Sequence, residues 1–202
     1  MFSFGSPDSK FAHGMETFAD AVWLTVLMLI TSIPLITIGA AITAAHETAR
    51  RIEQGEARIT IAYFRAFASN FLKSTAIWLV MGTLLILILW SWIAVRIPPL
   101  LIPQFAISLI WLLIAEWVFA LQARFENPIG KTFLNALIFS VSYWQATLGM
   151  LIVDALFVGL VAASVIYLPQ GLPLLLFLGW GSLIMLHTPL LEHVFAKYIK
   201  KK

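Results

Sequence analysis

The stretch ITSIPLITIGAAITAAHETARR, residues 30–51, decides the class of this chain. Its first sixteen residues carry no charge, a proline stands at position 34, and the stretch ends in Arg50 and Arg51. A membrane helix, a cleaved signal peptide and a buried helix of a soluble protein are the three structures that fit such a pattern. The composition of the whole chain separates the membrane class from the soluble class.

Apolar residues dominate the 202-residue chain, which is 61% hydrophobic and 11% charged, with a mean hydropathy of +0.93. In soluble domains about a quarter of the residues are charged. Runs without Asp, Glu, Lys or Arg that are long enough to cross a bilayer occur at 21–45, 74–95, 97–115, 132–153 and 155–191. These runs lack the alternation of a β-barrel, so we expect an all-α, polytopic integral membrane helix bundle.

We place five transmembrane helices in one membrane domain that covers residues 1–202. The last uncharged run is too long for a single helix, and the sequence LPQGLP at 168–173 predicts a turn that divides it. The predicted spans are about 18–40, 74–95, 104–123, 146–168 and 173–192.

The distribution of Lys and Arg predicts the orientation of these spans. Successive segments outside the spans carry one, five, one, two, none and four basic residues. Cytoplasmic segments are enriched in Lys and Arg, so we expect the N-terminus outside and the C-terminus in the cytoplasm. The basic tail KYIKKK, residues 197–202, is then expected to lie against anionic lipid headgroups rather than nucleic acid.

Two of the inner connections have helical spacing. In ITIAYFRAFASNFLKST (59–75) and KTFLNALIFSVSYWQAT (131–147), apolar side chains recur every three or four residues. We expect cytoplasmic amphipathic connecting helices that lead into the following spans. Their shared order of basic turn, amphipathic helix and span suggests a duplicated unit; alternatively, both helices simply pack on the inner ends of the spans.

The opening stretch then reads as a retained, kinked span. A signal peptide has a positive segment before its apolar run, whereas here Arg50 and Arg51 follow it. Pro34 removes a backbone donor, so we expect the helix to kink or break near Ile33, to resume at Leu35 and to run to Glu53. Gly39 lies in the same kinked region, and it allows a neighbouring backbone to approach closely.

The segments SIPLITIGAAITA (32–44) and YFRAFASNFLKST (63–75) resemble the YesL-like family of bacterial membrane proteins, domain of unknown function number 624. ARFENPIGKTFLNAL, residues 123–137, is similar to a second segment of that family. The family has no established biochemical activity, and its members often accompany genes for ABC importers of oligosaccharides. The residues that carry the resemblance are Pro34, Thr37, Gly39, Ala40, Phe64, Phe67, Asn70 and Phe71.

Motifs for enzymatic chemistry are missing from the sequence. It has no cysteine, no phosphate-binding glycine loop, no HExxH and no GxSxG, and its four histidines form no metal-ligand pair at helical spacing. We therefore expect no catalytic residue, no metal site and no cofactor.

Three ionisable residues inside the predicted spans are informative about function. Glu116, Asp154 and His187 share the predicted cytoplasmic half of the membrane, where charge is costly and normally faces protein or water. One interpretation is a polar site for a proton, an ion or a substrate group. The other is a structural network in which these residues pair with Arg124, Gln122 or Arg50.

Two functions follow from these observations. The first is a non-catalytic accessory or assembly subunit of a bacterial carbohydrate ABC uptake system, which is implied by the resemblance and would contact permease subunits at the inner face. The alternative is a small autonomous transporter or channel that uses the intramembrane carboxylates, with a homo-oligomer as one possible form. The residues expected to dock a partner are Arg50, Arg51, Phe64, Arg65, Phe67 and Phe71.

Overall fold

Helices make up all the regular structure in the residues that the computed structural model describes, which are 10–56, 58–95 and 97–199. Five of these helices are long and apolar enough to cross a membrane, which confirms the predicted fold class. The elements in chain order are α1 (Lys10–Ser32), η1 (Leu35–Thr37), α2 (Ile38–Glu53), α3 (Ile59–Ala94), η2 (Pro98–Leu100), α4 (Leu101–Arg124), α5 (Ile129–Ser142), α6 (Trp144–Tyr167), η3 (Pro169–Gly171) and α7 (Leu172–Phe195).

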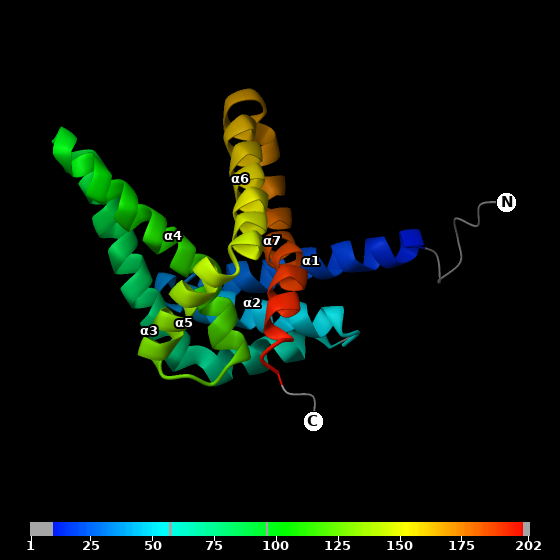
Figure 1. Cartoon of the computed structure of the whole chain (residues 1–202). Coiled ribbons are helices and arrows are strands. Elements are labelled where there is room, and N and C mark those ends of the chain that lie inside the picture. Colours follow the sequence, from blue (N-terminus) through cyan, green and yellow to red (C-terminus); the bar gives the residue numbers. More distant parts are fainter. Residues whose placement is uncertain (1–9, 57, 96, 200–202) are drawn as a thin grey trace.

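Two helical hairpins, α3–α4 and α6–α7, diverge from a base that contains α1, α2 and α5 (Figure 1). A short 3-10 turn with a proline at its start closes each hairpin, η2 in the first and η3 in the second. Proline suits the first position of a helical turn because its missing N–H would have no partner there. The turn predicted at 168–173 is therefore present, and α4, α6 and α7 include nearly all of the predicted third, fourth and fifth spans.

The break predicted at Pro34 is present, but it is longer than a kink. α1 ends at Ser32 and α2 begins at Ile38, so the helix does not resume at Leu35 and the first span does not continue to about residue 40. The intervening 3-10 turn has side-chain partners: Trp78 Nε1 donates to the Leu35 carbonyl at 2.8 Å, and Thr37 Oγ1 donates to the Pro34 carbonyl at 2.7 Å. The Trp78 bond gives the Leu35 carbonyl a partner from α3, and the Pro34 carbonyl accepts from the Thr37 N–H as well as from Thr37 Oγ1.

The end of α2 agrees with the sequence. This helix stops at Glu53, and Gly55 follows with a φ of 84°, a conformation that favours glycine.

The two amphipathic segments differ in how they join the spans that follow. The first is continuous with the second span, and together they form α3, a single helix of 36 residues. The second segment is not one helix, because α5 ends at Ser142 and α6 begins at Trp144. Tyr143 lies at this break with φ −114° and ψ 45°, and Thr147 Oγ1 donates to the Ser140 carbonyl at 2.9 Å across it. Helical spacing alone could not show this, because neither Gly nor Pro marks the break.

The base of the two hairpins holds the aromatic core. Trp117 of α4 is fully buried, and its ring packs against Phe139, Tyr143 and Phe195 from α5, the α5–α6 break and α7. A second cluster joins Leu24 of α1 to residues of α2, α3 and α7. The helices that carry the predicted polar residues are therefore fixed to one another at this level.

Candidate intramembrane ion site

The three predicted polar residues come together in the structure. Glu116 of α4, Asp154 of α6 and His187 of α7 each offer a ligand atom, and these atoms all lie within 4.8 Å of one another. His187 Nε2 lies 3.2 Å from Asp154 Oδ1. Both carboxylates are therefore directed into the bundle, as the sequence predicts. We call Glu116, Asp154 and His187 the polar cluster.

Burial differs within the polar cluster. His187 is 7% exposed, while Glu116 and Asp154 are partly buried. The Nε2 atom of His187 is buried and, among the described residues, no group makes a hydrogen bond of acceptable geometry with it. The imidazole and the Asp154 carboxylate are thus close neighbours without an aligned hydrogen bond between them.

Helical periodicity explains why these side chains face inward. Buried residues lie at helical spacing from each of them: Ala120 is four residues after Glu116, Met150 is four before Asp154, and Ile184 and Leu191 are three before and four after His187. On α7 the buried face includes a glycine that lets α1 approach. The buried positions that flank the cluster are Trp117 and Ala120 on α4, Thr147 and Met150 on α6, and Gly181, Ile184, Thr188 and Leu191 on α7.

A fourth ionisable residue, His46 of α2, lies beside the cluster. Burial, and then the nearby imidazole of His187, lower the pKa of His46 to about 3, although the carboxylate of Asp154 acts in the opposite direction. His46 is therefore neutral near pH 7. We did not predict it from the sequence, although its position seven residues after Gly39 puts it on the same, small-residue face of the helix.

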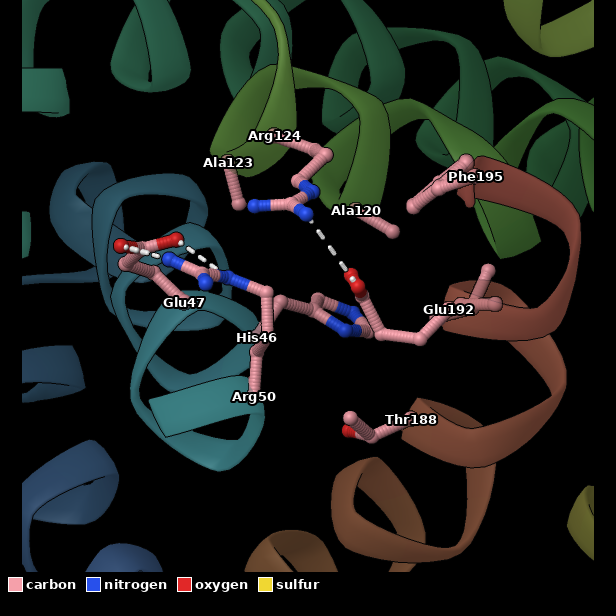
Figure 2. Close-up of a pocket in the computed structure, with 10 residues that line it drawn as sticks. His46, Glu47, Arg50, Ala120, Ala123, Arg124, Thr188, Glu192 and Phe195 are labelled. Carbon is pink, nitrogen blue, oxygen red and sulfur yellow. Dashed lines mark hydrogen bonds and ion pairs between the residues drawn. The ribbon is translucent and has the colours of Figure 1, made fainter. Parts of the chain in front are cut away.

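A layer of ion pairs separates the cluster from the ends of the helices. Arg124 Nη2 lies 3.4 Å from Glu192 Oε2, and Arg50 Nη2 lies 2.6 Å from Glu47 Oε1 (Figure 2). Glu116 precedes Arg124 by eight residues, which corresponds to about 12 Å along the helix. These charged groups therefore lie on the same side of the bundle as the cluster, but nearer to the surface.

A small cavity lies in this ion-pair layer. Its volume is about 10 Å³, which is close to the space that one water molecule needs. Figure 2 shows the imidazole of His46 extending from α2 toward α7, between Glu192 and Thr188. His46 thus lines the cavity and lies within the electrostatic reach of His187 and Asp154.

The arginine and glutamine partners expected for a purely structural network are engaged elsewhere. Arg124 pairs with Glu192, Arg50 pairs with Glu47, and Gln122 Nε2 donates to Asn70 Oδ1 at 3.3 Å. In the contacts that the structure describes, these three residues do not pair with Glu116 or Asp154, so the predicted pairing is wrong. The carboxylates have each other and an imidazole as neighbours instead.

The residues expected to dock a partner do not form one exposed surface. Arg50 and Arg51 both contact Glu47. The hydrogen bond from Arg51 to Glu47 raises the pKa of Arg51 above its usual value. Phe64 is 46% exposed, whereas Phe67 stacks on the buried Tyr63. Phe71 is partly buried and packs edge-on against Phe67, and Arg65 is exposed. These three phenylalanines are thus used partly for packing within the chain.

Comparison with known proteins gives one match. Residues 21–92 match the model of a family described as "Protein of unknown function, DUF624". This confirms the predicted resemblance over most of α1, over α2 and over nearly all of α3, and the matched region includes His46 but not the polar cluster. No curated protein and no solved structure matches the chain.

Proposed function

We propose that the chain is a small transporter or channel for a cation, without enzymatic activity, in which the polar cluster is the binding site within the membrane. The observation that carries the proposal is the convergence of Glu116, Asp154 and His187 from three helices, with His46 of a fourth helix beside them. Ionisable groups at membrane depth are costly, and they commonly line the path of an ion or a proton.

Two further features support this function. First, the arginines of the same region are paired with other carboxylates, so in the described contacts they do not neutralise Glu116 or Asp154. Second, His46 lines the small cavity of the ion-pair layer and lies near enough to His187 and Asp154 for both to affect its pKa. The break between α1 and α2 also fits, because interrupted helices frequently line transport sites.

The proposed orientation puts the ion-pair layer at the cytoplasmic face of a bacterial cytoplasmic membrane, with the N-terminus outside. The excess of Lys and Arg in 46–73, 123–145 and the C-terminal segment supports it. Of that segment, residues 200–202 lie outside the described residues, as does Arg96 of the opposite side. Accessory function in a carbohydrate ABC importer stays a prediction that the resemblance alone supports.

Single cysteines test this orientation without background, because the chain has none. We expect cysteine at position 55 or 130 to react with an impermeant maleimide only after the cells are opened. A cysteine in the η3 turn, such as Gln170→Cys, is the matched control and is expected to react in intact cells. Labelling of position 55 or 130 from outside would overturn the orientation.

Transport itself is tested in proteoliposomes that contain the purified full-length chain. We expect flux of protons or of a metal cation above that of protein-free vesicles, and we expect Asp154→Asn and Glu116→Gln to reduce it at least tenfold. Glu126→Gln is the matched control, because Glu126 is an exposed carboxylate in the α4–α5 connection. Equal flux in wild type and cluster variants would show that the cluster is not the site.

Absence of all cation flux would overturn the transport proposal. Recovery of permease subunits in a mild-detergent pull-down would then favour the accessory function, and the exposed Phe64 and Arg65 would be the first residues to test.

A further inference from the structure

We infer that the polar cluster binds a divalent transition-metal ion through one oxygen of Glu116, one oxygen of Asp154 and Nε2 of His187. This inference rests on the proposed function and names the class of cation that the site takes. Three ligands from α4, α6 and α7 leave coordination positions open, which is typical of sites that exchange what they bind.

The donor set distinguishes between classes of cation. Mg²⁺ and Ca²⁺ prefer sites made only of oxygen atoms, whereas imidazole nitrogen together with carboxylate suits Zn²⁺, Mn²⁺ and Fe²⁺. A site for a proton alone needs only one carboxylate. The combination of two carboxylates and an imidazole therefore favours a transition-metal ion.

The position of His187 Nε2 is the second, independent observation. This atom belongs to a side chain that is 7% exposed, and no described residue makes an aligned hydrogen bond with it. A buried polar atom without a hydrogen-bond partner destabilises the folded state. A metal ion shared with the neighbouring carboxylates would supply the missing partner.

The spacing of the ligand atoms agrees with a shared ion. Bonds of about 2.0–2.1 Å in a tetrahedral site separate two ligand atoms by about 3.3 Å. His187 Nε2 and Asp154 Oδ1 are 3.2 Å apart, and the Glu116 oxygen lies within 4.8 Å of both.

His46 lies on the side of the ion-pair layer, where it lines the small cavity. We assign His46 a positioning role beside the cluster, not a place among the three ligands.

The test is metal binding by the purified full-length chain in detergent after treatment with a chelator. We expect isothermal titration with Zn²⁺ and with Mn²⁺ to show one ion per chain, and Co²⁺ to give the visible absorption of a nitrogen- and oxygen-coordinated ion. Glu116→Gln, Asp154→Asn and His187→Gln are each expected to weaken binding at least tenfold. The controls His193→Gln and Glu126→Gln change exposed residues and are expected to bind as wild type does.

Folding of each variant is checked separately by its thermal unfolding without metal. An ion that binds only the folded chain raises the unfolding temperature, so we expect this rise in wild type and its loss in the three cluster variants. Unchanged metal affinity in folded cluster variants would overturn the inference.

The outcomes separate this inference from the transport proposal. Proton flux that depends on Asp154, in a protein that binds no transition metal, would overturn the metal site and leave the transporter standing. Metal binding that depends on the cluster, in a protein without any flux, would support the metal site and overturn the transporter.

Discussion

The α3–α4 and α6–α7 hairpins are each fixed to the base of the molecule by a close glycine contact, but the glycine lies on opposite partners. In the first case Gly39 belongs to the base helix α2, and a Cβ there would meet the Ser74 carbonyl and lie 2.5 Å from Trp78 Cβ of α3. In the second case Gly181 belongs to the hairpin helix α7, and a Cβ there would meet the backbone of α1 and lie 2.7 Å from Thr25 Oγ1.

The contacts around these glycines also differ in polarity. Gly181 N donates to Thr25 Oγ1 at 2.9 Å, so the second hairpin is attached through a buried polar bond. That hairpin also carries Asp154 and His187, whereas the first contributes only Glu116 to the cluster. The comparison teaches that the two hairpins contribute unequally to the cluster, one residue from the first and two from the second, and that the site forms where they meet.

The largest effect is expected where the two hairpins are joined. Trp117 of α4 is fully buried, and its Nε1 donates to Thr147 Oγ1 of α6 at 3.0 Å. We expect Trp117→Ala to reduce the free energy of unfolding by about 3–5 kcal/mol, because it removes a large buried ring and its hydrogen bond. Unfolding in SDS mixed micelles, followed by far-UV circular dichroism, measures this change.

Trp90→Ala is the matched control for this prediction. Trp90 lies near the outer end of α3 and is 63% exposed, so its removal leaves no internal cavity. We expect a cost of less than about 1 kcal/mol. If both variants lose equal stability, Trp117 is not the joint between the hairpins.

The glycine contacts give the next largest effect. We expect Gly39→Ala and Gly181→Ala each to cost about 1–3 kcal/mol, because the added methyl group meets backbone atoms that cannot move aside without shifting a helix. Gly181→Ala is expected to cost more, since separation of α7 from α1 also breaks the hydrogen bond to Thr25. The same SDS titration measures both variants.

Gly159→Ala controls for the general effect of replacing glycine within a helix. No atom lies within 4 Å of a Cβ at this position on α6, so we expect a small gain in stability from higher helix propensity. A gain at position 39 or 181 would contradict the close packing of that hairpin.

Much of this arrangement could be predicted from residues near one another in sequence. The uncharged runs predicted the spans, Pro34 predicted the break, and the carboxylates at membrane depth predicted an inward cluster. The length of the break was not predictable, because it depends on Trp78 of α3, which donates to the Leu35 carbonyl from 43 residues away. The division at Tyr143 likewise depends on tertiary packing against Trp117.

The composition of the site was harder to predict than its existence. Linear spacing suggested no metal site because the histidines are far apart, but ligands from separate helices need no common spacing. His46 was missed because it follows the uncharged run instead of interrupting it. Only its position on the small-residue face, seven residues after Gly39, indicated burial.

The smallest predicted effect concerns the outer ends of the hairpins, which are held in different ways. In the first hairpin Gln104 Nε2 donates to the Ser91 carbonyl at 3.0 Å and to Ser91 Oγ at 2.9 Å, which ties α4 to α3. In the second, Ser164 Oγ donates to the nearby Leu168 carbonyl at 2.9 Å. Hydrogen bonds between membrane helices contribute about 0.6 kcal/mol on average, so we expect Gln104→Leu to cost about 1 kcal/mol and Ser164→Ala about half of that.

Because both positions are far from the cluster, cation binding is expected to stay unchanged in the two variants. A loss of binding in Gln104→Leu with the fold retained would mean that the outer end of α3–α4 is coupled to the site, and that this hairpin does more than supply Glu116.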